Sequence, residues 1–252
     1  MSIKDLTQKS FSVLIIRSFG VLLLFGFTLF ITNFFTAENV GRYDFVRSTL
    51  MVLGGLALMG TNQSIIYYSG LLKARKSIES IRTIYFKMLR IIVALSLIIL
   101  GLFLGLFNES AITQTFNSTE SYALILKSIL TLIFFATTML NIDTIRALQN
   151  TILSEIYRSL FRYIPVFIFA IILIQYNQQP YLVEAYLLGF VLLSVFSGIK
   201  VLNMLASLKK PNDNSEKFSI KDIFKTSAPM ALSAIAYFIM QSIDIILSLI
   251  LI

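Results

Sequence analysis

Long apolar segments alternate with short polar stretches along the whole chain. A helix needs about 20 predominantly apolar residues to cross the hydrocarbon core of a membrane. Seven segments reach that length. The pattern therefore predicts seven membrane-spanning helices, at Phe11–Phe35, Tyr43–Ser69, Phe86–Phe107, Tyr122–Ile142, Tyr157–Tyr176, Tyr181–Leu205 and Thr226–Ile252.

The basic residues of the connections alternate between the two sides of the predicted membrane. Of the 21 basic residues, only Arg42, Arg47 and Lys127 belong to the side opposite the N-terminus. Basic residues in short loops concentrate on the cytoplasmic side. We therefore predict a multi-pass protein of the cell (inner or cytoplasmic) membrane with a cytoplasmic N-terminus. The net charge of +8 is then a topology signal, and we expect no nucleic-acid partner.

Composition narrows the function further, because 57% of the residues are hydrophobic and only 13% are charged. Cys and His are absent, which excludes disulfides, thiolate or imidazole metal ligands, and catalytic dyads that need either residue. Metal sites built from carboxylates alone stay open, although we expect no metal and no cofactor. No outer connection is long enough to hold a catalytic domain, so we do not expect an enzyme.

One polar stretch, "SLKKPNDNSEKFSIKD", stands between the sixth and seventh segments and predicts a domain boundary. We expect residues 1–205 to form a six-helix bundle and residues 206–225 a basic cytoplasmic linker. The end of that linker is amphipathic and is expected to lie on the inner membrane surface. Residues 226–252 would then be the first helix of a second bundle, which makes the chain a truncated piece of a longer protein.

Three predicted spans carry polar residues on one side only, within a sector of roughly 100° at helical spacing. Polar side chains in a membrane usually face a bundle interior or a water-filled cavity. Small and amide side chains also serve as helix-packing contacts, and this alternative stays open. The three sets are Asp44, Arg47, Gly54, Thr61 and Asn62; Lys127, Thr131, Thr138 and Asn141; and Ser233, Tyr237, Gln241, Asp244 and Ser248.

Two stretches resemble the polysaccharide and oligosaccharide flippases of the multidrug/oligosaccharidyl-lipid/polysaccharide exporter superfamily, of the O-antigen and teichoic-acid exporter type. The first is "FTAENVGRYDFVRSTLMVLGGLALMGTNQSIIYYSG", through Ala37, Val40, Gly41, Tyr43 and Gly60. The second is "FKTSAPMALSAIAYFIMQSIDIILS", through Ser227, Ala228, Pro229 and Asp244. It is similar to the opening of the second half of these proteins.

The resemblance implies an all-α polytopic fold of two six-helix bundles, in a transporter of about 12–14 helices, around a central cavity. This chain would supply the first bundle and one further helix, and the missing C-terminal bundle would be its partner. The implied function is movement of lipid-diphosphate-linked oligosaccharide across the cytoplasmic membrane by alternating access, for surface polysaccharide (O-antigen, lipopolysaccharide) biosynthesis.

The polar positions match the groups that such a substrate presents. Arg17, Arg47 and Lys127 are our candidates for attracting the diphosphate, because guanidinium and ammonium groups bind phosphate by charge-assisted hydrogen bonds. Asp44 and Asp244 are candidates for a coupling ion (H⁺ or Na⁺) or for an arginine partner. The candidates for bonding sugar hydroxyls are Asn62, Thr131, Asn141, Tyr237 and Gln241.

Two other functions remain open. A cation-coupled multidrug antiporter of the same superfamily would favour acidic cavity residues, whereas Arg17, Arg47 and Lys127 make these spans basic. A membrane-embedded scaffold subunit would need no transport site, and the seven-span length favours it, because half a transporter cannot alternate alone.

Overall fold

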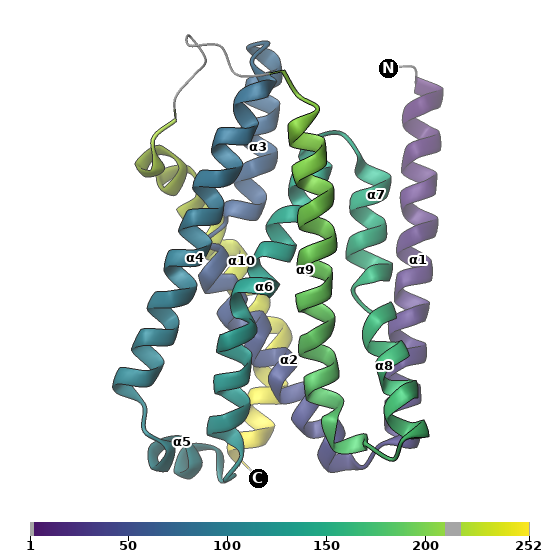
Figure 1. The fold of residues 1–252 in the computed structure, drawn as a ribbon, viewed down its shortest axis with the longest axis vertical. Coiled ribbons are helices and arrows are strands. Elements are labelled where there is room, and N and C mark those ends of the chain that lie inside the picture. Colours follow the sequence, from purple (N-terminus) through teal and green to yellow (C-terminus); the bar gives the residue numbers. More distant parts are fainter. Residues whose placement is uncertain (1–2, 210–217, 252) are drawn as a thin grey trace.

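The computed structural model describes residues 3–209 and 218–251, and within them the side chains of all but residues 3–6, 234, 237, 238 and 241–251. All regular structure in this part of the chain is helical (Figure 1). The α-helices are α1 (Ile3–Phe34), α2 (Ala37–Leu58), α3 (Thr61–Ala74), α4 (Ile81–Leu106), α5 (Glu109–Phe116), α6 (Ser121–Ala147), α7 (Thr151–Ile156), α8 (Ile164–Gln175), α9 (Leu182–Ala206) and α10 (Ile220–Leu251).

The two ends of the bundle are named here by the helices that lie there. The α5 end also holds the start of α2 and the turn between α8 and α9, and corresponds to the predicted outer side (Figure 1). The α3 end holds the start of α1 and the end of α9, and corresponds to the predicted cytoplasmic side (Figure 1).

Among the described residues, five helical stretches are long and apolar enough to cross a membrane, and a sixth is obtained if α2 and α3 count as one bent span. Large apolar side chains such as Leu22, Phe25 and Phe196 point outward and are about 60% exposed. This surface fits a lipid environment, so the chain is an all-α membrane protein. The count of seven spans is not confirmed, because the end of α10 has no described side chains.

The second predicted span, Tyr43–Ser69, is not one helix. It is broken between α2 and α3, which meet at an angle of 42°. Both residues at the break are left-handed, Met59 with φ 45° and Gly60 with φ 73°. Glycine is needed at the second position for another reason as well, since a Cβ atom there would lie 2.3 Å from the carbonyl oxygen of Ser227 on α10. The break is therefore the point where α10 crosses closest.

The fifth predicted span, Tyr157–Tyr176, begins too late. The helical stretch starts with α7 at Thr151, passes through the π-helical turn η2 (Tyr157–Phe161), and continues as α8. Pro165 stands in the first turn of α8 and has no N–H to continue an earlier ladder, which explains the change of helix there. Gly20 of α1 lets the two segments touch, because a Cβ atom at Gly20 would lie 2.5 Å from Cβ of Ser159.

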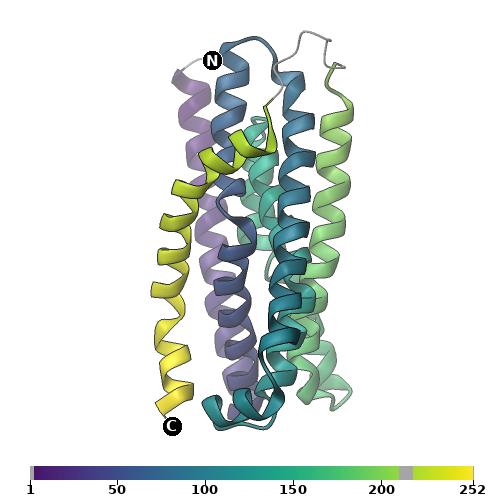
Figure 2. The same ribbon diagram turned by 90° about the vertical axis from the view of Figure 1, so that its left-hand side faces the viewer.

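Helix α10 starts with a capping box, in which the Ser219 hydroxyl accepts from the Asp222 N–H at 3.1 Å and the Asp222 carboxylate accepts from the Ser219 N–H at 2.8 Å. These hydrogen bonds lower the pKa of Asp222. The amphipathic segment predicted to lie on the membrane surface is the inclined first part of α10 (Figure 2). It packs on α3, where the Tyr68 hydroxyl donates to Thr226 at 3.1 Å and the Tyr68 ring meets Phe218.

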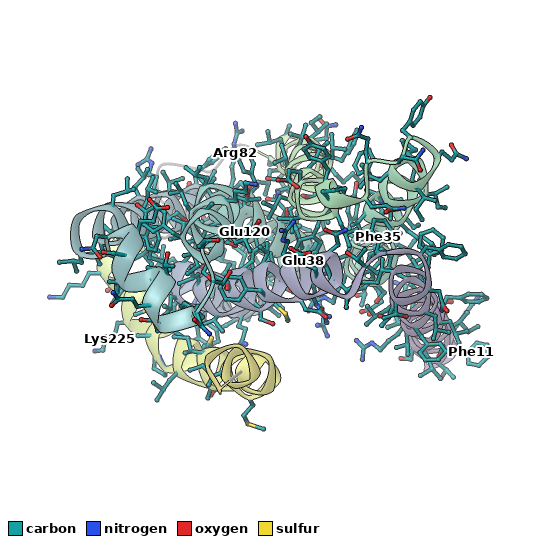
Figure 3. All side chains as sticks on the ribbon, turned by 90° about the horizontal axis from the view of Figure 1, so that it is seen from below. Phe11, Phe35, Glu38, Arg82, Glu120 and Lys225 are labelled. Atoms are coloured by element: carbon teal, nitrogen blue, oxygen red, sulfur yellow. The ribbon has the colours of Figure 1, made fainter. Side chains whose placement is uncertain are left out.

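Helix α6 is the centre of the bundle and packs against α2, α3, α4 and α9. Helix α1 lies at one edge, on α7 and η2, and α10 lies on α2 and α3. Seen along the bundle, α2 runs between α10 and α1, and no other described helix covers the side of α2 between them (Figure 3). That side matters because polar residues of α2 are partly exposed, as described next.

Candidate functional site

Arg47 of α2 lies inside the second predicted span, four residues after its start at Tyr43 and ten residues after the start of α2 at Ala37. Arg47 Nη1 is 3.7 Å from Asp44 Oδ1, and the two side chains are 30% and 36% exposed. The predicted Asp44–Arg47 pair is confirmed, and it is open enough to meet a ligand.

Three tyrosines lie near enough to Arg47 to act on its charge. Besides Asp44, the groups that act electrostatically on Arg47 are the hydroxyls of Tyr43, Tyr163 and Tyr186. Tyr43 and Tyr186 are buried, and their rings meet edge to face at 5.0 Å between centroids. A buried aromatic contact of this kind fixes the position of both rings.

A second arginine, which we did not predict as a site residue, joins this group. Arg162 follows η2, and its guanidinium carbon lies 5.7 Å from the centroid of the Tyr163 ring and 5.9 Å from that of Phe190. It also acts electrostatically on the Tyr186 hydroxyl. Its Nε is buried and has no hydrogen-bond partner. The Arg162 side chain as a whole is half-buried, and an unfilled buried donor on it favours an acceptor beside it.

These six residues, Tyr43, Asp44, Arg47, Arg162, Tyr163 and Tyr186, are called the tyrosine–arginine cluster below. The cluster holds two guanidinium groups and one carboxylate, so its formal charge is positive. Guanidinium groups and phenolic hydroxyls are hydrogen-bond donors that suit phosphate oxygens, and their interactions strengthen where water is scarce. The arrangement is therefore that of a site for an anionic group.

A different set of charges lies nearer the α3 end. Arg17 of α1 donates to both carboxylate oxygens of Glu155 on α7, from Nε at 3.1 Å and from Nη2 at 3.2 Å. The Ser159 hydroxyl donates to the same carboxylate at 2.8 Å. Glu155 is 6% exposed, whereas the Arg17 side chain is 60% exposed. Arg17 thus anchors α1 to α7 and still presents part of its guanidinium outward.

Asp143 of α6 extends this inner set. It accepts from Asn62 of α3 at 3.1 Å and from Arg158 of η2. Asp143 is only 4% exposed. Asn62 was predicted to bind sugar, and the structure instead places its amide nitrogen on Asp143, joining α3 to α6. Arg158 also acts on Glu155, so the two carboxylates belong to one network.

The predicted polar stripe of the fourth span faces α9. Lys127 forms an ion pair with Glu184 at 2.5 Å, and Asn141 donates to Ser197 at 3.0 Å and accepts from Tyr85 at 2.7 Å. Thr131 bonds its own helix, at the Lys127 carbonyl. Thr138 is fully buried, as Asn141 is. Helix packing, the alternative left open above, accounts for this stripe along most of its length.

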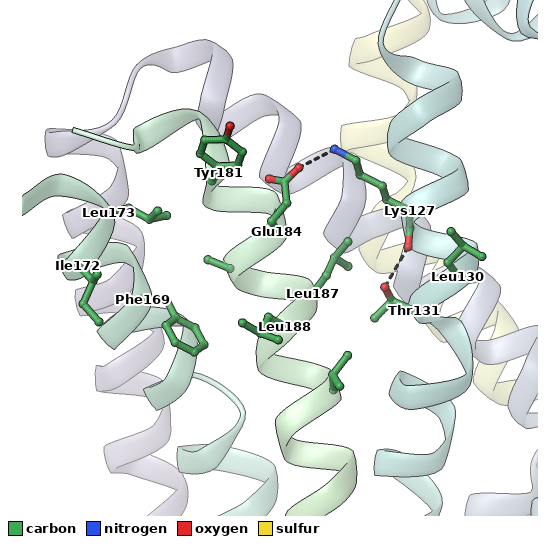
Figure 4. A pocket seen from close by; sticks show the side chains of 12 residues that line it. Lys127, Leu130, Thr131, Phe169, Ile172, Leu173, Tyr181, Glu184, Leu187 and Leu188 are labelled. Atoms are coloured by element: carbon green, nitrogen blue, oxygen red, sulfur yellow. Dashed lines mark hydrogen bonds and ion pairs between the residues drawn. The ribbon is translucent and has the colours of Figure 1, made fainter. Parts of the chain in front are cut away.

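Lys127 and Thr131 also line a groove of about 600 Å³ between α6, α8 and α9 (Figure 4). This groove lies on the side of α9 away from the tyrosine–arginine cluster. The remaining predicted residues, Tyr237, Gln241 and Asp244, have side chains outside the described residues. Ser233 of the same stripe is exposed.

The search for metal ligands and the comparisons with known proteins add no assignment. Among the described residues, no group of three or more acidic side chains gathers where it could hold a metal ion. No protein-family model, no curated protein and no solved structure matches the chain.

Proposed function

We propose that this protein moves a lipid-diphosphate-linked oligosaccharide across the cytoplasmic membrane by alternating access, and that the tyrosine–arginine cluster binds the diphosphate. The observation that carries the proposal is that two arginines flank one buried aromatic group. Arg162 lies 5.9 Å from the ring of Phe190, which packs on Tyr186. Tyr186 in turn packs on Tyr43 of α2, the helix that carries Asp44 and Arg47. The sequence resemblance to glycan flippases supports the same substrate class.

Placing two arginines inside a membrane is costly unless a function or a partner compensates for it. Asp44 offsets only one of the two charges, and at 3.7 Å it does so without a close hydrogen bond. A diphosphate that enters from the open side of α2 would neutralise the excess. The sugar head would then lie beside the partly exposed side chains of Asp44 and Arg47. The lipid tail would stay in the membrane.

The charge network formed by Arg17, Glu155, Asn62, Asp143 and Arg158 would hold the bundle together rather than bind substrate. Arg17, Asn62 and Arg158 each bind a buried carboxylate on a neighbouring helix, so the network ties α1, α3, α6 and α7 together. Broken ion pairs in a low-dielectric interior are costly, by about 3–5 kcal/mol where one partner is lost. The network therefore keeps the helices of this bundle together while the bundle moves as one body.

The cation-coupled antiporter is the second candidate, and the buried acids weigh against it. Asp143 and Glu155 are the buried carboxylates among the described residues, and each already binds an arginine. A cation would have to displace those partners. A non-transporting scaffold would give no reason for Arg47 and Arg162 to lie in one cluster with three tyrosines.

The proposal is tested by complementation in cells that lack export of a surface polysaccharide. We expect Arg47→Gln to abolish export while the variant accumulates in the membrane at the normal level. Arg42→Gln is the matched control, because Arg42 stands five residues earlier on α2 and pairs with Glu38 and Glu120 at the α5 end. Full export by Arg47→Gln, or an equal loss with Arg42→Gln, would refute the role of the cluster.

A further inference from the structure

The groove between α6, α8 and α9 has the dimensions and the lining of a site for one lipid chain. Its volume is about 600 Å³, within the range of roughly 300–1,000 Å³ of small-molecule sites. Its walls are almost entirely apolar, from Leu130 on α6, Phe169 and Ile172 on α8, and Leu187 and Leu188 on α9 (Figure 4). An apolar groove that faces hydrocarbon is filled by hydrocarbon rather than by water.

The groove covers half of the membrane. It begins at Tyr181 and Glu184, at the start of α9, and continues to Val191, nine residues into that helix. Nine residues of helix correspond to about 13 Å, close to one leaflet of a hydrocarbon core about 30 Å thick. One acyl chain of a phospholipid in the leaflet at the α5 end therefore spans the groove from mouth to bottom.

The mouth of the groove carries one positive and one negative group side by side. The side chains of Lys127 and Glu184 are 44% and 40% exposed, and they bind each other at 2.5 Å (Figure 4). An ammonium group has three donors, so Lys127 keeps two for another acceptor. Glu184 Oε1 accepts from Lys127 and, as a carboxylate oxygen, has a second lone pair for another donor, whereas Oε2 is buried and has no partner. Tyr181 stands at the rim, more than half exposed.

This mouth complements a zwitterionic headgroup with a primary ammonium. The phosphate of phosphoethanolamine would accept from Lys127, and its ammonium would donate to Glu184. A purely anionic headgroup would meet the Glu184 carboxylate with no charge to offset it. A choline headgroup offers no N–H to donate.

The groove is separate from the tyrosine–arginine cluster. Successive residues of an α-helix are rotated by about 100°. Leu188 is therefore turned by about 40° from Glu184, whereas Tyr186 is turned by about 200°. The cluster and the groove lie on opposite faces of α9, so a lipid in the groove does not occupy the site proposed for the substrate.

We propose that this groove is a binding site for a phosphatidylethanolamine molecule of the leaflet at the α5 end, with its acyl chain along α8 and α9 and its headgroup on Lys127 and Glu184. The protein would thus take a structural lipid on one face and its substrate on another. This site does not depend on the identity of the transported molecule.

The absence of Trp from the chain makes the test direct, because a single introduced Trp is the only one to report. We would place it in the groove as Leu188→Trp and, as a control, on the lipid-facing side of α1 as Phe25→Trp, where the native side chain is 61% exposed. Each variant is reconstituted in phosphatidylcholine vesicles that contain a rising fraction of lipid with brominated, fluorescence-quenching acyl chains. The brominated lipid is phosphatidylethanolamine, phosphatidylglycerol or phosphatidylcholine in turn.

We expect brominated phosphatidylethanolamine to quench Leu188→Trp at about one third of the mole fraction needed with phosphatidylcholine, since exposed charged contacts contribute modestly. At Phe25→Trp the three lipids should quench alike. Adding Lys127→Gln or Glu184→Gln to Leu188→Trp should remove the preference. Equal quenching by all three lipids at Leu188→Trp, or a preference for phosphatidylglycerol, would overturn the proposal. If the added substitutions prevent folding, the comparison of lipids on the native pair still decides.

Discussion

Gly60→Ala is the substitution whose effect follows most directly from the structure, because two separate costs meet at one atom. Gly60 has φ 73°, a left-handed conformation that costs a residue with a side chain about 1–2 kcal/mol. The added methyl would also lie 2.3 Å from the Ser227 oxygen and 2.7 Å from the Ala231 nitrogen, both backbone atoms of α10.

Backbone atoms cannot rotate away as a flexible side chain does, so α10 must move. Overpacking of this kind costs about 1–3 kcal/mol. Together the two costs amount to about 2–5 kcal/mol, and 1.4 kcal/mol corresponds to a tenfold change in an equilibrium. We therefore expect Gly60→Ala to reduce the docking of α10 on α3 at least tenfold.

A disulfide reports this docking without ambiguity. The chain has no cysteine, so Ser64→Cys with Ser227→Cys introduces the only pair. The two hydroxyl oxygens are 2.7 Å apart across α3 and α10, within reach of a sulfur–sulfur bond after modest adjustment. The measurement is the rate of disulfide formation under mild oxidation, with and without Gly60→Ala.

Gly70→Ala is the control, since Gly70 lies in α3 with no atom within 4 Å of an added Cβ. Replacing a helical glycine by alanine there should leave the cross-linking rate unchanged and raise stability by about 1 kcal/mol or less. An undiminished rate with Gly60→Ala would show that α10 does not cross at the helix break, and the reasoning would fail.

Three further experiments test other parts of the structure. Tyr68→Phe removes the hydrogen bonds to α10, which costs about 1 kcal/mol, and should lower the thermal unfolding midpoint. Tyr67→Phe, at the exposed neighbour, should leave the midpoint unchanged. Equal midpoints for the two variants would contradict this. Asn141→Ala should destabilise the bundle by about 1–2 kcal/mol in a denaturation assay, because it leaves buried partners on α4 and α9 unbonded; a neutral result would argue against the packing role. For orientation, an impermeant thiol reagent added to intact cells should label Asn177→Cys and not Lys76→Cys, and the reverse would invert the topology.

Hydropathy predicted the places of most helices but not the breaks within them. Met59 adopts a left-handed conformation that its own sequence does not favour, and the crossing of α10 beside Gly60 supplies the reason. Such a contact joins residues that are more than 160 positions apart. The start of the fifth span was missed because α7 carries Glu155, whose cost in the membrane is offset by Arg17 on α1.

The candidate site was predictable only where its residues lie close together in the sequence. The spacing of Asp44 and Arg47 on one helix is a local feature, and the structure confirms the pair. Arg162 was counted with the cytoplasmic basic residues, and no polar stripe was predicted on the fifth span. Tyr163 follows Arg162 in the sequence, whereas the place of Tyr186 beside them depends on the packing of α8 on α9. Asn141 and Lys127 share the periodicity of a cavity stripe, but periodicity does not distinguish a cavity from a neighbouring helix.

The central claim is that the tyrosine–arginine cluster binds the diphosphate of a transported lipid-linked oligosaccharide. The most direct measurement is the initial rate at which a tagged lipid-diphosphate oligosaccharide crosses the membrane of vesicles that contain the purified protein. A lost charge-assisted hydrogen bond costs about 1.5–3 kcal/mol, so Arg47→Gln and Arg162→Gln should each slow transport by about tenfold to a hundredfold, while Arg42→Gln leaves it unchanged. Equal rates in all variants, or no transport above that of protein-free vesicles, would contradict the account.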